Sequence, residues 1–181
     1  ESEQRLRLAL DAARMGTFDW DLTTGHVTWS PGHERLWGLE PGTFAGTYEA
    51  FAERVHHDDL GPLNAEVERC VATHEPFERE FRVVWPDGSV HWALGRGEFL
   101  FDGTDSAIRM RGVVQDTTAR KAAEVLLREN EHRFEEAQRD AGIGSWRYLA
   151  DGTVIWSSQM YELLPVPRDV PLTHDQVVRV I

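Results

Sequence analysis

The sequence predicts an α+β domain in which helices pack on one face of an antiparallel sheet. Two short alternating segments lie within residues 17–29, a region rich in helix and loop signals covers residues 30–73, and three alternating segments follow within residues 80–114. Alternation of apolar and polar residues is typical of strands with one buried face. Strands grouped around a helical middle, instead of alternating with helices, favour the α+β plan.

The N-terminal region predicts a helix followed by a hairpin. Residues 3–15 place apolar residues at helical spacing, namely Leu6, Ala9, Leu10 and Ala13. Gly16 ends this helix. The alternating segments 17–22 and 26–29 then flank the turn residues 23–25, which is the pattern of two paired strands.

The middle of the chain predicts two kinds of helical structure. Residues 30–59 favour short helices and loops, because Gly and Pro recur there at Gly38, Pro41, Gly42 and Gly46. Asp58 and Asp59 come directly before the periodic apolar residues Leu63, Val67 and Val71. A carboxylate in front of such a run is typical of a helix N-cap, so a longer helix is expected to be capped here.

Three strands are expected next, and each is expected to turn its bulky apolar residues to the same face. The expected inward residues are Phe81, Val83 and Trp85 in the first strand, Val90, Trp92 and Leu94 in the second, and Ile108, Met110, Gly112 and Val114 in the third. Pro and Gly in residues 86–89 and Gly in residues 102–105 predict the two turns.

Residues 118–141 predict a long helix with a narrow apolar stripe. Ala123, Leu127, Asn130, Phe134 and Ala137 fall at alternating steps of four and three. This spacing is typical of a coiled-coil seam and indicates a parallel homodimer. A solvated linker helix without a partner is the alternative.

The beginning of the chain recurs after this helix. Residues 12–18 and 27–30 return as residues 140–146 and 154–157, so that Gly16 corresponds to Gly144 and Trp29 to Trp156. We therefore expect a first domain over 1–117, a linker helix over 118–141, and the N-terminal part of a second, truncated copy over 142–181, as in a piece of a larger modular protein.

Composition narrows the possible partners. The chain has 181 residues and a net charge of -12, from 19 basic and 31 acidic residues. An acidic surface argues against a broad nucleic-acid interface, and no apolar stretch approaches the ~20 residues of a membrane span, so no membrane contact is expected. Cys70 is the single cysteine, which excludes a disulfide framework and is consistent with a cytoplasmic location.

Five short motifs follow one another along the first part of the chain, namely Leu36–Pro41, Val55–Leu60, Phe77–Val83, Pro86–Trp92 and Gly112–Lys121. In this order they resemble the Per-Arnt-Sim (PAS) sensory domain with its C-terminal PAC segment. His57 and Thr117 are mild departures from the family pattern. The resemblance implies a five-stranded sheet of order 2-1-5-4-3 around a small cavity. It also implies a sensory role in a tandem array of a bacterial signalling protein, with a histidine kinase or diguanylate cyclase output domain in the same chain.

The resemblance also implies a candidate site. The cavity would lie between the long helix and the sheet, with candidate lining residues Phe51, Val55, Leu63, Val67, Phe81, Val83, Trp92, Leu94 and Met110. Each of them could equally be ordinary core. Asp116, Thr117 and Thr118 match the segment that transmits the signal to the exit helix, where they can also act simply as a helix cap.

No residue pattern predicts catalysis or a bound metal. Residues 56–59 form a His-His-Asp-Asp run, but adjacent residues rarely converge on one ion, so a helix start is expected there. Flavin and haem are disfavoured by the resemblance, since Cys70 lies outside the photoreceptor motif and Leu63 occupies the haem-ligand position. No cofactor is expected. The alternatives are a ligand-free dimerisation or spacer module and a flavin- or haem-binding light or redox sensor.

Overall fold

The computed structural model describes residues 5, 8–10, 12–164 and 172–173. The chain divides into two compact units, residues 1–122 and 123–181. Of the helix predicted over residues 3–15, Arg5, residues 8–10 and Ala12 are helical, Ala13 and Arg14 form a turn, Met15 already belongs to a strand, and the remaining residues lie outside the described ones. The final part of the expected second copy, residues 165–171 and 174–181, also lies outside them.

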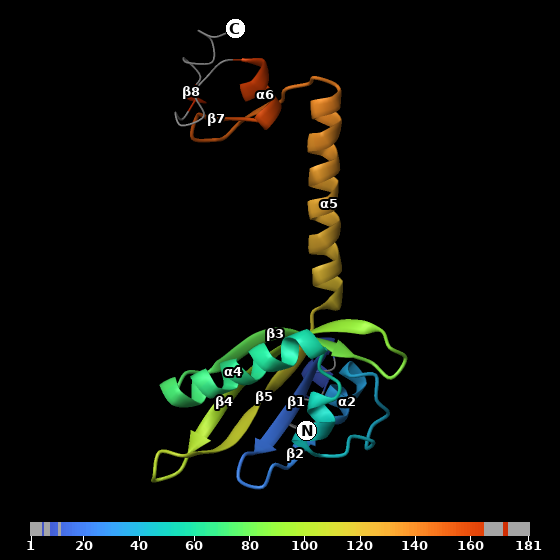
Figure 1. The fold of residues 1–181 in the computed structure, drawn as a ribbon, viewed down its shortest axis with the longest axis vertical. Coiled ribbons are helices and arrows are strands. Elements are labelled where there is room, and N and C mark those ends of the chain that lie inside the picture. The colour runs from blue at the N-terminus through green and yellow to red at the C-terminus, as the bar shows by residue number, and fades with distance from the viewer. Residues whose placement is uncertain (1–4, 6–7, 11, 165–171, 174–181) are drawn as a thin grey trace. The chain divides into compact units, whose positions relative to one another are not determined.

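The first unit contains a five-stranded antiparallel sheet (Figure 1). Its strands are β1 (Met15–Asp21), β2 (Val27–Trp29), β3 (Phe77–Val84), β4 (Val90–Phe101) and β5 (Ala107–Asp116). The strand order is β2-β1-β5-β4-β3, as predicted. The first and last strands of the sequence therefore lie side by side in the middle of the sheet.

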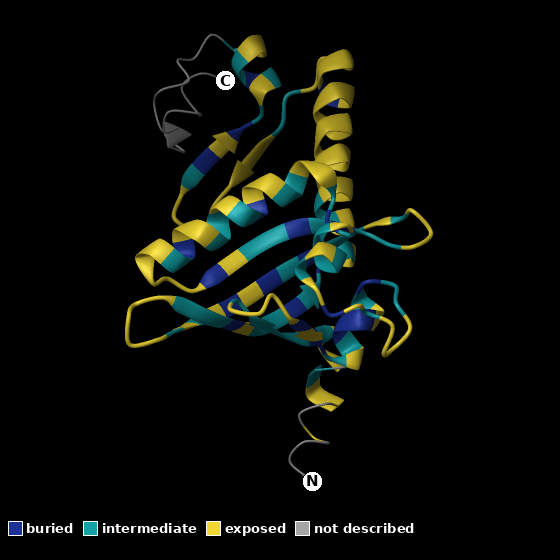
Figure 2. Cartoon of the chain, turned by 60° about the horizontal axis from the view of Figure 1, so that its bottom comes forward, coloured by how far each residue is buried: buried dark blue, intermediate teal, exposed yellow. Residues whose placement is uncertain are grey.

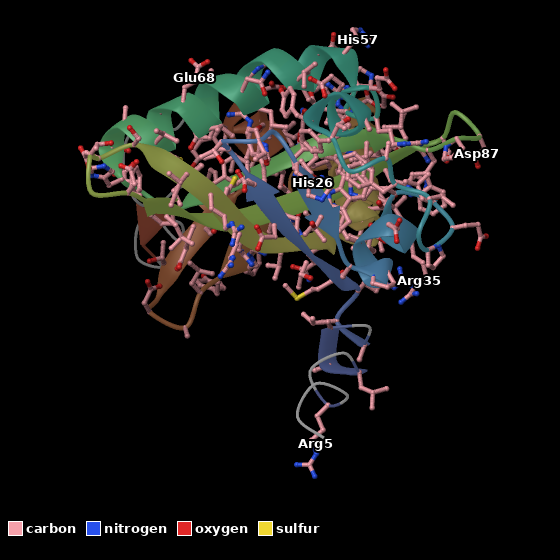
Figure 3. All side chains as sticks on the ribbon, turned by 90° about the horizontal axis from the view of Figure 1, so that it is seen from below. Arg5, His26, Arg35, His57, Glu68 and Asp87 are labelled. Carbon is pink, nitrogen blue, oxygen red and sulfur yellow. The ribbon has the colours of Figure 1, made fainter. Side chains whose placement is uncertain are left out.

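Between β2 and β3 the same unit contains the helices α2 (Pro31–Leu36), α3 (Tyr48–Ala52) and α4 (His57–Thr73). The longest, α4, is amphipathic, because Leu63, Val67 and Cys70 are buried or half-buried while Glu68 projects away from the sheet (Figure 3). Figure 2 shows the buried residues concentrated on the facing surfaces of α4 and the strands. The helices thus pack on one face of the sheet, as predicted.

The cap of α4 differs from the prediction. His56 is the N-cap, and its Nδ1 accepts a hydrogen bond from the amide of Asp58 at 3.3 Å. Asp59 lies in the first turn and binds β3 instead, accepting from the backbone amide of Arg82 at 2.7 Å and from its guanidinium at 2.6 and 2.9 Å. The expectation that Asp58 or Asp59 caps the helix was wrong by two or three residues, although carboxylates in a first turn still favour the helix dipole.

The expected orientation of β4 was wrong as well. The register pairs Arg82 with Trp92 and Phe81 with Ala93, and cross-strand partners share a face. Ala93 and Phe81 are buried, so Trp92 and Leu94 face the opposite side of the sheet. Small residues occupy the inner face of β4 because the rings of Phe77 and Phe81 already fill the space above Gly95, at 3.2 and 3.3 Å from where a Cβ would lie.

The exit helix α5 (Thr118–Asp140) corresponds to the long helix predicted over residues 118–141 and continues from the first unit into the second. The second unit also contains β6 (Trp146–Tyr148), β7 (Thr153–Trp156), α6 (Ser158–Leu163) and β8 (Leu172–Thr173), with sheet order β6-β7-β8. Among the described residues, no helix combines the length and the apolar character needed to cross a membrane.

The hairpins that open the two units share local contacts. The hydroxyl of Ser30 accepts from the amide of Thr17 at 2.9 Å, and the hydroxyl of Ser157 accepts from the amide of Ser145 at 3.0 Å. A Cβ on Gly16 would lie 2.3 Å from His33, and a Cβ on Gly144 would lie 2.3 Å from Met160. Gly16 therefore lets α2 pack directly on β1, and Gly144, which lies just before β6, lets the side chain of Met160 on α6 approach the backbone closely.

Candidate functional site

The first unit encloses a cavity of about 70 Å³. Five of the nine predicted cavity residues line it: Phe51, Leu63, Val67, Phe81 and Met110. Val55 and Val83 are buried and form an isolated bridge with each other, but they lie outside the lining. Trp92 and Leu94 are on the outer face of the sheet. The structure thus brings together residues from α3, α4, β3 and β5.

Several lining residues were not predicted, and they supply the polar groups of the cavity. Tyr48 donates a hydrogen bond to Asn64 Oδ1 at 2.6 Å, so these two side chains satisfy each other. Trp20 and His33 also line the cavity, and neither Trp20 Nε1 nor His33 Nε2 has a hydrogen-bond partner among the described residues. The Ser-Pro sequence before His33 signals a helix start, but it does not indicate that the imidazole is enclosed.

His33 is held firmly in the neutral state. Its side chain is stacked on Trp29, with ring centroids 4.2 Å apart and planes 6° apart, and the residue is 2% exposed. Burial lowers the pKa of His33 to about 3, against a smaller opposing effect of the hydrogen bond to the Thr17 backbone. At neutral pH the imidazole is therefore uncharged.

The first turn of α5 is joined to the sheet by hydrogen bonds that centre on the backbone of Trp92. Asp116 Oδ1 accepts from the amide of Thr118 at 2.9 Å, which caps the first turn. The amide of Thr117 donates to the carbonyl of Trp92 at 2.9 Å, and the amide of Trp92 donates to Thr118 Oγ1 at 3.0 Å. All three residues predicted for signal transmission therefore lie in one contact between β4, β5 and α5, which we call the Trp92 clasp.

Glu80 on β3 extends this clasp and was not predicted as part of it. Its carboxylate forms an ion pair with Lys121 at 2.7 Å and another with Arg120, and it accepts from Thr117 Oγ1 at 3.1 Å. The ammonium group of Lys121 also lies 5.1 Å from the centre of the Trp92 ring. The sequence does not indicate this link, because Glu80 and its partners Arg120 and Lys121 lie about forty positions apart.

Comparison with known proteins identifies the family. A family profile described as PAS fold matches residues 26–114, which include the cavity strands β3, β4 and most of β5. The chain contains a PAS domain.

Relatives of this PAS domain are signalling proteins. A blue-light-activated histidine kinase of Brucella anthropi is 29% identical over 140 residues, covering 75% of this chain and 28% of the relative. The sensor protein FixL of Bradyrhizobium diazoefficiens is 26% identical over 128 residues, covering 71% and 25%. The chain thus spans about a quarter of the length of these two relatives.

Solved structures agree with the fold. The crystal structure of a sensory box histidine kinase/response regulator from Burkholderia thailandensis matches with a TM-score of 0.64 at 27% identity, covering 73% of this chain and 98% of that one. The N-terminal domain of a diguanylate cyclase with PAS/PAC sensor from Marinobacter aquaeolei matches with a TM-score of 0.54 at 18% identity, covering 59% and 98%. The second likeness concerns the fold alone.

The single cysteine is placed away from the PAS cavity. Cys70 is fully buried, and its Sγ lies near the Glu66 carboxylate and the Pro76 carbonyl, each at 3.6 Å. Burial raises the pKa of the Cys70 thiol, so the reactive thiolate is disfavoured. Because Cys70 is outside the cavity lining, its position does not fit thiol chemistry on a ligand bound there.

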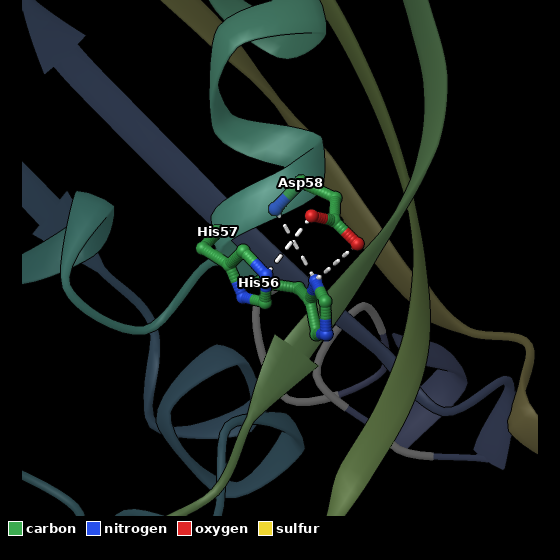
Figure 4. Close-up of side chains that lie close together, drawn as sticks. All are labelled: His56, His57 and Asp58. Atoms are coloured by element: carbon green, nitrogen blue, oxygen red, sulfur yellow. Dashed lines mark hydrogen bonds and ion pairs between the residues drawn. The ribbon is translucent and has the colours of Figure 1, made fainter.

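The His56–Asp58 cluster is more compact than expected of adjacent residues. One ligand atom from each of His56, His57 and Asp58 lies within 4.8 Å of the others (Figure 4). However, His56 Nδ1 already accepts the Asp58 amide, and the Arg82 guanidinium lies 3.5 Å from the Asp58 carboxylate. A neighbouring cation disfavours a metal ion, so the arrangement serves as the start of α4.

We expect Glu80→Gln to loosen the first turn of α5. Burial alone would raise the pKa of Glu80, but hydrogen bonds from Lys121 and Thr117 and the charges of Lys121 and Arg120 lower it overall. A lowered native pKa means that the contact stabilises above the ordinary carboxyl value of 4.5 and is lost as pH falls through the native value. Loss of the Glu80 contacts should destabilise the first turn of α5 by about 1 kcal/mol. Above pH 5, the backbone amide of Lys121 should therefore exchange roughly fivefold faster in the variant than in the wild-type chain.

Glu78→Gln is the matched control for this change. Glu78 is also on β3, but its partner is Arg96 on β4, at 3.0 Å, and not α5. Hydrogen exchange followed by NMR should show no change at Lys121 in this variant. Equal exchange in both variants would mean that Glu80 does not hold the helix.

Proposed function

We propose that the chain is a sensory signalling module in which occupancy of the PAS cavity changes the state of helix α5. The observation that carries the proposal is the double role of β5. Met110 and Val114 of this strand line the cavity, and Asp116 at its end caps the first turn of α5. A ligand that displaces β5 therefore acts on the helix start within the same strand.

The Trp92 clasp provides the contact through which a displacement of β5 would reach α5. Because the helix start is hydrogen-bonded to both β4 and β5, a change in the spacing of these strands must be accommodated by the first turn of α5. A ligand that binds one of two helix arrangements better shifts the population by its difference in affinity, and a few kcal/mol is enough.

We propose further that α5 pairs with α5 of a second copy as a parallel homodimer. The seam residues Ala123, Leu127, Asn130, Phe134 and Ala137 are spaced for a coiled coil, and Leu127 and Phe134 are 59% and 63% exposed in the single chain. The shared hairpin contacts support the proposal that the second unit begins another PAS copy in a tandem array. The relatives support an output domain elsewhere in the same chain, a histidine kinase or a diguanylate cyclase.

The main rival is a ligand-free dimerisation or spacer module. A thermal-shift screen of small uncharged compounds separates the two, because a ligand that binds only the folded state stabilises it by RT ln(1 + [L]/Kd). We expect at least one compound to raise the melting temperature of the wild-type chain in a concentration-dependent manner. A complete lack of stabilisation across the screen would favour the spacer.

We also propose that the module works without flavin or haem and carries out no catalytic step. Pockets for such large ligands typically measure about 300–1,000 Å³, well above the 70 Å³ enclosed here. Since a blue-light-activated kinase is among the relatives, a visible absorption spectrum of the purified protein is the direct check. A cytoplasmic location, supported by the unpaired Cys70, belongs to the same proposal.

A further inference from the structure

Helix α4 forms part of the cavity wall and is anchored at its start to the edge of the sheet. Leu63, Asn64 and Val67 of this helix line the cavity. Asp59 lies one turn before Leu63 and accepts a hydrogen bond from the backbone amide of Arg82 on β3 at 2.7 Å. A ligand that pushes α4 away from the sheet therefore acts on the contact between Asp59 and Arg82.

The side chain of Arg82 extends this contact to the outer face of the sheet. Its Nε and Nη2 donate to the two carboxylate oxygens of Asp59 at 2.9 and 2.6 Å, a bidentate pair that fixes the orientation of the guanidinium. The guanidinium carbon lies 5.8 Å from the centre of the Trp92 ring, within the range of a cation–π contact. One side chain thus contacts both the first turn of α4 and a residue of β4.

The Trp92 ring contacts α5 as well. Lys121 Nζ lies 5.1 Å from the centre of the same ring and 2.7 Å from the Glu80 carboxylate. Because two cations share one aromatic ring, a shift of Arg82 alters the position or the electrostatic surroundings of the ring that Lys121 faces. Asp59, Arg82, Trp92 and Lys121 therefore form a continuous series of contacts from α4 to the first turn of α5, which we call the Arg82 link.

Exposure distinguishes the Arg82 link from an ordinary surface ion pair. The side chains of Arg82 and Asp59 are 29% and 19% exposed, and that of Lys121 is 26% exposed. The side chains of the Arg96–Glu78 pair on the same face of the sheet are 49% and 60% exposed. Exposed pairs are screened by solvent and hold their geometry poorly, so the less exposed groups are better able to transmit a displacement.

We propose that Arg82 is a positioning residue that couples α4 to α5, so that the PAS cavity reports its occupancy through α4 as well as through β5. The inference rests on the proposed function and specifies how the helical wall of the cavity reaches the exit helix. Strand β5 responds to a ligand that presses on the sheet, and the Arg82 link responds to a ligand that presses on α4.

The test uses two equal truncations of the cavity wall in the full chain. Val67→Ala removes two methyl groups from α4, and Val114→Ala removes two from β5. The readout is hydrogen exchange, followed by NMR, at the backbone amide of Lys121, which donates to the Thr117 carbonyl at 2.9 Å in the first turn of α5. We expect each truncation to change this exchange rate about threefold.

The two truncations should respond differently to the loss of Arg82. In the Arg82→Gln background, Val67→Ala should no longer change the exchange of Lys121, so the ratio of the two rates should fall from about three to about one. Val114→Ala should keep its full effect, because the connection from β5 to α5 through Asp116 does not involve Arg82.

Arg96→Gln is the matched control. Arg96 lies on the same face of the sheet, and its ion-pair partner at 3.0 Å is Glu78 on β3, not a residue of α4. In this background Val67→Ala and Val114→Ala should both act as they do in the wild-type chain. If Arg96→Gln also removes the effect of Val67→Ala, the loss is a general effect of charge and the Arg82 link is rejected.

The outcomes separate this inference from the proposed function. An effect of Val67→Ala that is equal with and without Arg82 would overturn the Arg82 link and leave sensing through β5 intact. If neither valine variant changes the exchange of Lys121, the link is overturned and the proposed function is rejected with it. If Arg82→Gln does not fold, the indole 15N resonance of Trp92 decides the question, because it must shift in Val67→Ala when Arg82 is present, and an unchanged resonance would overturn the link.

Discussion

Replacing Gly16 with alanine is expected to lower the free energy of unfolding of the first unit by about 3 kcal/mol. The added Cβ would lie 2.3 Å from the Cα of His33 and 2.4 Å from its backbone nitrogen. These atoms belong to the backbone of α2, so no side-chain rotation can relieve the overlap. The helix must move away from β1, which would also displace His33 from Trp29.

Gly61→Ala is the matched control, because its Cβ would meet no atom within 4 Å apart from its chain neighbours. Gly61 lies within α4, where alanine is the better helix former, but the ring of Pro62 disfavours a Cβ on the residue before it, so the net change should stay within about 1 kcal/mol. Urea denaturation should therefore show a large loss of stability for Gly16→Ala and a small shift for Gly61→Ala. If Gly16→Ala unfolds at the wild-type midpoint, α2 does not pack on β1 as described.

The second large effect is expected on assembly. Replacing Leu127 and Phe134 together with aspartate should convert a dimer to a monomer, because two charges from each chain would be buried in the proposed seam. Both side chains are already exposed in the single chain, so the substitutions should leave its folding unchanged. Sedimentation velocity and far-ultraviolet circular dichroism measure the two properties separately.

The control for this experiment places the same charges on another face of α5. Val125, which is 53% exposed, and His132 lie seven residues apart and outside the seam spacing. Val125→Asp combined with His132→Asp should leave the dimer intact. Dissociation in both variants would indicate a general effect of charge, and dimers that persist in the Leu127 and Phe134 variant would reject the seam.

The order of elements was predictable because it depends on local patterns. Alternation identified the strands, helical spacing identified α4 and α5, and the family resemblance supplied the strand order. Which side chains of β4 lie on the inner face of the sheet was not predictable in the same way. Bulk at Trp92 and Leu94 suggested the inner face, but the structure puts Ala93 and Gly95 there, since the rings of β3 occupy the available space.

The candidate site was predictable only in part for a related reason. Apolar lining residues such as Leu63 and Phe81 were predicted from the periodic spacing of apolar residues, because burial of one face of a helix or strand produces that spacing. His33 and Glu80 act through contacts with residues distant in sequence, Thr17 and Trp29 for one and Lys121 for the other. The spacing of residues in a single sequence does not indicate which backbone group or charged side chain, far away in the sequence, a polar side chain will contact.

The attachment point of α5 has a consequence for which motions can reach it. Trp92 belongs to β4, an interior strand, and both of its backbone hydrogen-bonding groups are engaged with Thr117 and Thr118. Fraying of the outer strand β2 would leave this joint undisturbed, whereas the other edge strand, β3, contacts α5 directly through Glu80. Helix α5 should therefore respond to distortions of β4, β5 and β3 and be insensitive to local opening of the β2 edge.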